Sequence, residues 1–249
     1  MIKDFTKNTM RGFLAFTLAE TLIVMGIIGI VSALTLPNLN SSTGEKEKVA
    51  KVKKLYQNFD DAVGRATAVY GPMDEWVKTD NSVSAQTTRF GERITEFMKV
   101  SKTCTTSTSN SACFKRKNFT TQMDLSSATL YSFILADGTS VAMQYDSNYA
   151  STPKNAVWFF VDIDGANKGQ GKLGTDVFAF SSNLANGNMM DTLGTPYVSD
   201  VTTGRGEAAT AWVINYDNMD YLKANSSGKC NGSNVTLNAF ANPPVTSCK

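Results

Sequence analysis

Residues 16–36 read FTLAETLIVMGIIGIVSALTL, and this apolar stretch decides the organisation of the chain. At 1.5 Å per residue it would form a helix of about 31 Å, close to the ~30 Å hydrocarbon core of a bilayer. The basic segment before it accounts for the whole net charge of +2. Because basic flanks stay in the cytoplasm, we expect residues 1–15 to be a cytoplasmic leader. Residues 16–37 are then a single transmembrane helix of the cytoplasmic (inner) membrane, with the remainder outside.

Glu20 is the only charged residue of this stretch. A carboxylate near the middle of a spanning helix costs about 2.5–3.5 kcal/mol, so such residues usually serve a function. Cleavage of the leader would make Phe16 the amino terminus. Glu20, one helical turn further on, would then reach the charged terminus of a neighbouring chain. The sequence therefore predicts that Glu20 acts in assembly.

Phe16-Thr17-Leu18-Ala19-Glu20 resembles the processing motif of type IV prepilins and type II secretion pseudopilins. In that family a prepilin peptidase cuts before the phenylalanine and methylates the new amino terminus. The resemblance implies a cut between Ala15 and Phe16, with Ala15 in place of the family's glycine, and N-methylation of Phe16. A proline commonly follows 21 residues after the cut, which here is Pro37. Glu20 and Pro37 are thereby implied as assembly residues.

Two other interpretations of the stretch stay open. A plain membrane anchor would have no need of Glu20. A secretory signal peptide would use Leu22–Ile30 as its apolar core and Val31-Ser32-Ala33 as its cleavage site. Cleavage there would leave Leu34 as the mature terminus.

The second helical pattern begins at Glu45. Apolar residues recur there at intervals of three and four until Tyr70, and Gly71-Pro72 ends the pattern. We expect residues 38–71 to form an amphipathic continuation of the first helix. Its first half carries a run of lysines: Lys46, Lys48, Lys51, Lys53 and Lys54. The run is interpreted either as a contact for lipid head groups or a partner chain, or as a solvated face of the helix.

The sheet signal begins at Leu130, where LYSFILA, Asp137-Gly138 and TSVAMQY predict a β-hairpin with a type I′ turn. Residues 156–163 and 176–180 predict further strands, for an antiparallel meander of about four. The fold class expected is α+β and pilin-like. A long N-terminal helix, half transmembrane and half amphipathic, packs on an antiparallel β-sheet head over residues 72–249.

Four cysteines fall into two local groups, which is typical of two disulfides in an exported domain. Three connectivities are possible, and proximity favours Cys104–Cys113 and Cys230–Cys248, the latter closing a C-terminal loop. The alternative is four reduced, buried thiols. No CxxC pair occurs, so neither a zinc site nor a thioredoxin-like motif is indicated.

An enzyme is not expected, because the chain has no histidine and no Walker, GxGxxG or GxSxG motif. The three tryptophans are interpreted as core residues rather than a sugar-binding platform. Asp162, Asp164 and Asp176 are the best candidates for chemistry, since three hard oxygen ligands can hold calcium. The alternative is a turn in which these residues satisfy backbone groups. No other cofactor is expected.

The function expected is that of a structural subunit of a type IV pilus or type II secretion pseudopilus-like filament. Its partners would be other pilin-like subunits, the prepilin peptidase and, before assembly, membrane lipid. The filament would be extracellular or periplasmic. The neutral body indicates no nucleic acid partner.

Two other function classes stay open. A binding module, such as an adhesin or DNA-uptake pilin, would show an exposed aromatic row or a basic groove on its head. A hydrolase would show a cleft with two facing carboxylates.

Overall fold

The computed structural model describes residues 17–77, 80–107, 112–115, 129–146, 156–166, 168–169, 171–184, 196–203 and 206–249, without the side chains of 34–43, 77, 105–107, 156 and 183. The leader, with Ala15 and Phe16, lies outside the described residues. The chain divides into two units, Met1–Gly44 and Glu45–Lys249. Helix α1, Leu18–Tyr70, belongs to both. The units are treated separately below, and the second is called the head.

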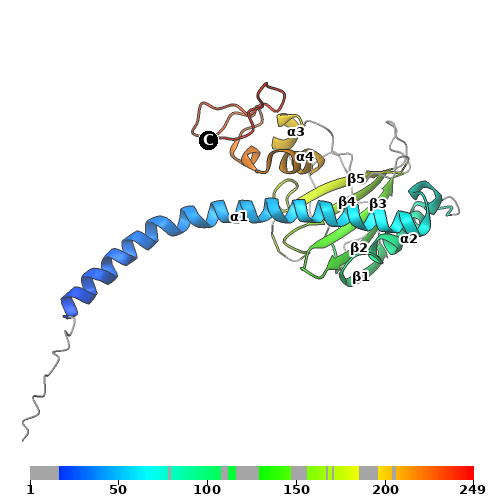
Figure 1. Cartoon of the computed structure of the whole chain (residues 1–249), viewed down its shortest axis with the longest axis horizontal. Helices are drawn as coiled ribbons and strands as arrows, with labels where there is room; N and C mark the ends of the chain where they lie inside the picture. Colours follow the sequence, from blue (N-terminus) through cyan, green and yellow to red (C-terminus); the bar gives the residue numbers. More distant parts are fainter. Residues whose placement is uncertain are drawn as a thin grey trace, which may run out of the picture. The chain divides into compact units, whose positions relative to one another are not determined.

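The head is built on a five-stranded antiparallel sheet in which each strand pairs with the next one along the chain (Figure 1). The strands are β1 Val100–Ser107, β2 Leu130–Leu135, β3 Ser140–Asp146, β4 Ala156–Asp162 and β5 Val177–Asn183. The α+β class and the antiparallel meander are thus confirmed. Strand β1 was not expected, because VSKTCTTS lacks the apolar alternation of a half-buried strand.

Short helices pack against the sheet and add buried residues to its core. They are η1 Met73–Val77, α2 Val83–Thr95, α3 Val198–Thr202, α4 Gly206–Tyr216 and η2 Asp220–Lys223. Ser82 caps α2 by accepting a hydrogen bond from the Ala85 amide. Gly91 lets α2 approach the sheet, because a Cβ there would lie 2.1 Å from the Tyr131 ring.

Both faces of the sheet are buried. Along β4, Val157, Phe159 and Val161 enter one apolar cluster, while Trp158 and Phe160 enter the other, as the two-residue period of a strand requires. The larger cluster contains the buried stripe of α1, which is Val49, Val52, Leu55, Phe59, Ala62, Val63 and Ala66. Within the head, α1 thus buries one stripe of residues and leaves other positions exposed.

The predicted hairpin is present, but its turn is not type I′. Among the described residues outside glycine, only Asp217 has a positive φ, so Asp137 does not adopt the conformation that type I′ requires. Instead the Gly138 amide bonds to the Leu135 carbonyl, and Gly138 has φ +86°. The Asp137 side chain accepts from the Thr139 amide. This is the longer hairpin loop, a tight turn followed by a left-handed glycine.

The expected transmembrane half of the helix is wrong, and with it the pilin-like fold class and the single-pass inner-membrane localisation. In the described part of the chain, no helix is both long enough and apolar enough to cross a membrane. Among the described residues 18–33, Glu20 and Ser32 interrupt the apolar run.

Replacing Phe59 tests the packing of α1 on the sheet. Phe59 is fully buried, and its ring lies 5.0 Å from that of Phe159. Phe59→Ala should lower the free energy of unfolding by about 3–5 kcal/mol, because it leaves a cavity that the sheet cannot close. Urea denaturation measures this. Val69→Ala, on the exposed side of the same helix, should change it by less than about 0.5 kcal/mol. Equal losses from the two variants would contradict the buried stripe.

Candidate functional sites

Glu20 belongs to a hydrogen-bonded cap at the start of α1. Its Oε2 accepts from the Thr17 amide at 2.8 Å and from the Thr17 hydroxyl at 2.8 Å, while the Glu20 amide donates to Thr17 Oγ1 at 3.2 Å. This reciprocal arrangement is a capping box, and the amide bond is the main reason why the pKa of Glu20 is lowered. The spacing T-x-x-E of this motif is visible in the sequence at Thr17 and Glu20, although the cap was not predicted.

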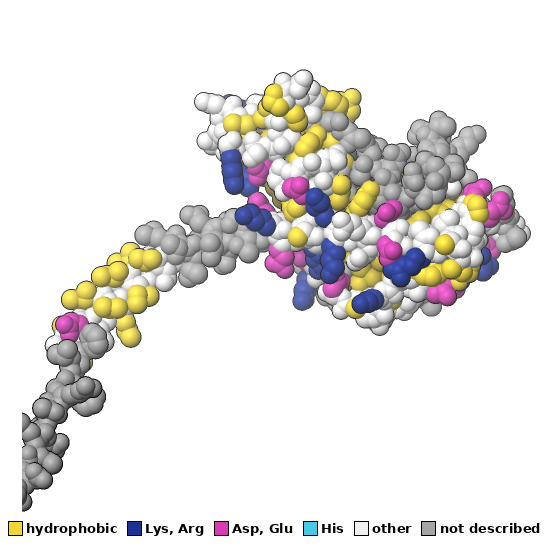
Figure 2. Space-filling model, in the orientation of Figure 1, with side chains coloured by type: hydrophobic (Ala, Val, Ile, Leu, Met, Phe, Trp, Pro, Cys, Tyr) yellow, Lys and Arg dark blue, Asp and Glu magenta, His cyan; other side chains and the backbone are white. Residues whose placement is uncertain are grey.

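The first described turns of α1 expose an apolar surface (Figure 2). Nine large side chains between 18 and 31 are each more than half exposed: Leu18, Leu22, Ile23, Val24, Met25, Ile27, Ile28, Ile30 and Val31. They form rows at i, i+4 and i+7 around the whole helix, so no polar face remains. A helix that is apolar all round is normally buried against something else. The side chain of Pro37, the other predicted assembly residue, lies outside the described set.

Three lysines of α1, Lys48, Lys51 and Lys53, form hydrogen bonds and ion pairs with loops of the head. Lys48 Nζ donates to the Thr175 carbonyl at 3.2 Å and lies 3.8 Å from Asp164 Oδ2. Lys51 donates to the Ile163 carbonyl, and Lys53 pairs with Asp217. Neither earlier interpretation of the lysine run anticipated this. The contacts join residues more than a hundred positions apart, so local sequence could not show them.

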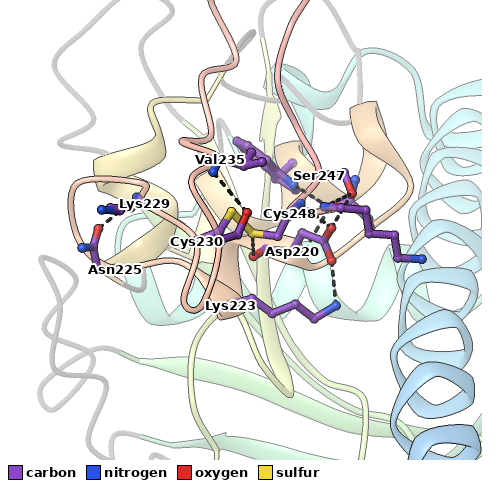
Figure 3. Close-up of a disulfide and its surroundings, with 12 residues drawn as sticks. Asp220, Lys223, Asn225, Lys229, Cys230, Val235, Ser247 and Cys248 are labelled. Atoms are coloured by element: carbon purple, nitrogen blue, oxygen red, sulfur yellow. Dashed lines mark hydrogen bonds and ion pairs between the residues drawn. A yellow bond between two sulfur atoms is a disulfide. The ribbon is translucent and has the colours of Figure 1, made fainter.

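Where α1 enters the head, at Glu45, the helix is linked to the carboxy-terminal segment through Lys223 and Asp220 (Figure 3). Lys223 Nζ lies 2.8 Å from Glu45 Oε2 and 2.7 Å from Asp220 Oδ1. The other oxygen, Asp220 Oδ2, accepts from Ser247 Oγ at 2.7 Å and from the Cys248 amide at 2.9 Å. Burial raises the pKa of Asp220, but these hydrogen bonds outweigh burial, and the net pKa is lowered.

Both predicted disulfides are confirmed. Cys104 is bonded to Cys113 and Cys230 to Cys248, and no cysteine is free. The second bond lies beside Asp220, so the carboxylate and the disulfide hold the same stretch of chain (Figure 3). The C-terminal loop is thereby closed covalently and tied to η2.

The three predicted calcium ligands bind backbone groups or a lysine. Asp162 Oδ1 accepts from the amides of Asp164 and Gly165, as in a side-chain-stabilised turn. Asp176 accepts from the amides of Gly171 and Lys172. No group of three potential metal ligands occurs among the described residues. The geometry supports the turn interpretation, and the calcium site remains a prediction without structural support.

A groove of about 740 Å³ runs between α1 and the β2–β3 turn. Asp61, Glu96 and Asp137 lie on it, so it is the place to look for the paired carboxylates of a hydrolase. Asp61 pairs with Arg65, and Glu96 accepts from the Tyr70 hydroxyl, which raises the pKa of Tyr70. Because these carboxylates are engaged with partners, the groove offers no support for acid–base catalysis.

An exposed aromatic pair lies where the C-terminal loop meets α3. The rings of Tyr197 and Phe240 are 4.8 Å apart, centroid to centroid, and the residues are 63% and 56% exposed. The three tryptophans are buried, so the core interpretation of those residues is confirmed. The pair could not be predicted from the sequence, because its members are distant in sequence and neither belongs to a recognisable motif.

No family model matches this chain, and no curated protein or solved structure shows significant similarity to it. A functional proposal therefore depends on the surfaces just described.

Replacing Asp220 tests the link between η2 and the C-terminal loop. The Asp220 side chain is 7% exposed, and Asp220→Asn should lower the free energy of unfolding at pH 7 by about 2 kcal/mol, because charged hydrogen bonds are lost. Since the folded pKa lies below the ordinary value of 3.8, the stabilisation is complete above that value. It is lost as the pH falls through the folded pKa. The difference between variant and wild type should therefore shrink below about pH 4.

The matched control is Asp217→Asn, because the Asp217 side chain is 68% exposed in its pair with Lys53. It should cost less than about 1 kcal/mol at any pH. Denaturant unfolding between pH 2.5 and 8 measures both variants. A difference for Asp220→Asn that stays constant over the acid range would contradict the assigned role.

Proposed function

We propose that this chain is a structural subunit of a filament of the type IV pilus or type II secretion class, assembled through the first part of α1. The observation that carries the proposal is the apolar surface between Leu18 and Val31, exposed on every side of the helix. Burying nine such side chains against neighbouring helices would release roughly 10–20 kcal/mol before the cost of association. An all-round apolar helix suits a core in which each helix contacts several others.

Glu20 gives this assembly a defined register. Both of its hydrogen bonds to Thr17 end on Oε2, and Oε1 has no hydrogen bond within the described part of the chain. The second oxygen is therefore available to the amino terminus of another subunit. If that subunit has been processed, its amino terminus at Phe16 would be positively charged and would lie next to the Glu20 carboxylate. An unpaired charge in the apolar core would be costly, so correct register is favoured over slipped arrangements.

Three variants separate the capping role of Glu20 from its charge. Glu20→Gln keeps an acceptor for the Thr17 amide, since glutamine also serves in capping boxes, but removes the charge. Glu20→Ala removes both, and Thr17→Ala removes the hydroxyl cap while keeping the charge. We expect about tenfold less incorporation for both Glu20 variants and near-normal incorporation for Thr17→Ala.

Incorporation is measured by immunoblot of sheared filaments, from cells that express each variant in place of the native chain. Total protein in the same cells controls for expression. Normal incorporation of Glu20→Gln together with a loss for Thr17→Ala would show that Glu20 only caps the helix, and would overturn the registration role.

Processing is tested by mass spectrometry of the amino-terminal peptide from purified filaments or total cell protein. We expect a terminus at Phe16 that carries a single methyl group. Replacing Ala15 with a bulky residue such as Trp should leave the leader attached. A terminus at Leu34 would instead establish a signal peptide and contradict the proposed processing.

A second function, that of a binding module, is favoured by the aromatic pair Tyr197–Phe240. An exposed aromatic surface on the head was the feature named above as distinguishing a ligand-binding subunit from a purely structural one. The two functions are compatible, because they use separate surfaces of the chain.

A further inference from the structure

The aromatic pair is held in place before any ligand arrives. Phe240 lies in a tight loop whose ends are bonded to each other, since Asn238 and Val245 exchange both backbone hydrogen bonds at 2.8 and 2.9 Å. The Asn238 side chain accepts from the Phe240 amide at 3.0 Å. The Cys230–Cys248 disulfide closes the segment. A rigid surface of this kind loses little conformational entropy when it binds.

Tyr197 is positioned by the first residues of α3. Val198 packs against the loop at Gly228, where an added Cβ would lie 2.8 Å from Val198 Cγ1. Thr202 Oγ1 donates to the Ser226 carbonyl at 3.5 Å, a second link between α3 and the loop. The α3 helix is thus held to residues 226–228, just before the loop that carries Phe240, and the two rings pack against each other. The pair Tyr197 and Phe240 is here called the aromatic platform.

The loop that carries Phe240 is uncharged and rich in carboxamides. No Asp, Glu, Lys or Arg occurs between Cys230 and Cys248 in the sequence, whereas Asn occupies positions 231, 234, 238 and 242. Three of these side chains, Asn231, Asn234 and Asn242, make no hydrogen bond to the described part of the chain. Each carboxamide can both donate and accept a hydrogen bond.

A polar hollow of about 420 Å³ lies at the start of this loop, lined by residues of the loop and by two that precede it: Asn225, Lys229, Cys230, Asn231, Gly232, Ser233 and Asn234. Lys229 is the one charged residue on that lining, and the other polar groups are carboxamides and a hydroxyl. A hollow of this composition suits a ligand with many neutral donors and acceptors.

We propose that the C-terminal loop binds neutral oligosaccharides, with the aromatic platform as the stacking surface. A pyranose ring combines an apolar C–H face, which stacks on an aromatic ring, with a rim of hydroxyls, which carboxamides recognise. Nucleic acid also stacks on aromatic rings, but its phosphates require several Lys or Arg residues, whereas none occurs between Cys230 and Cys248 and Lys229 is the one cation on the lining of the hollow. This inference rests on the binding-module function proposed above and names its ligand.

The test uses the full chain in a sugar-free detergent, applied to an array of neutral oligosaccharides of glucose, galactose, mannose and N-acetylglucosamine. The strongest ligand is then titrated by calorimetry. Tyr197→Ala and Phe240→Ala should each raise the Kd about tenfold, and the double variant should lose measurable binding.

Control variants separate stacking from general effects. Tyr197→Phe and Phe240→Tyr keep both rings and should bind within about threefold of wild type. Val69→Ala alters a residue that is 63% exposed, as Tyr197 is, but lies on α1, and it should bind like wild type.

Absence of binding to every neutral oligosaccharide would overturn the inference, as would unchanged affinity in the double variant. A heparin fragment, oligothymidylate and an apolar peptide are measured in parallel. If one of these binds through the aromatic platform and no neutral oligosaccharide does, the binding-module function survives and the proposed ligand class is wrong. Filament incorporation of the double variant shows separately whether the structural function holds.

Discussion

Phe59 of α1 packs on two neighbouring strands, and its ring centroid lies 5.0 Å from that of Phe159 on β4 and 6.1 Å from that of Phe180 on β5. The sheet depends on this contact, because strands that expose an apolar face are only marginally stable until that face is covered. The helical period of residues 49–66 and the two-residue period of β4 present complementary faces to each other. The polar links then fix the helix along that surface. Lys48, Lys51 and Lys53 join one side of α1 to the loops, and Glu45 reaches Lys223 near the disulfide.

These observations also show why some features could be predicted from the sequence and others not. The amphipathic helix, the hairpin and β4 follow from local periodicity, because burial of one face imposes that period on the residues themselves. Strand β1 was not predicted because it is an edge strand whose described residues are mostly exposed, so its sequence has no regular alternation of apolar and polar residues. The hairpin turn was assigned to the wrong type because Asp-Gly suits two loop lengths. Only the hydrogen bond from the Gly138 amide to the Leu135 carbonyl distinguishes them.

The candidate sites divide in the same way. Thr17 and Glu20 are three residues apart, so their cap is readable in principle. Asp220 binds Ser247 and Cys248, and Tyr197 meets Phe240, across separations that no local pattern encodes. The prediction of a membrane-spanning helix was wrong for a different reason. It was inferred from the apolar run in the sequence, whereas no helix among the described residues is long and apolar enough to span, and the carboxylate in the run caps its own helix.

The two exposed apolar surfaces differ in a way that favours different partners. Between Leu18 and Val31 the side chains are aliphatic apart from Met25 and cover the whole circumference of the helix, so they favour close packing but specify little direction. Direction must come from Glu20, the one charge at the edge of that surface. The aromatic platform is smaller, and the loop that carries Phe240 has exposed carboxamides at Asn231, Asn234 and Asn242, which suit directional recognition of a polar ligand. An aliphatic helix with one charge fits a symmetric assembly of like subunits. An aromatic surface among neutral amides fits a ligand that is chemically unlike the chain.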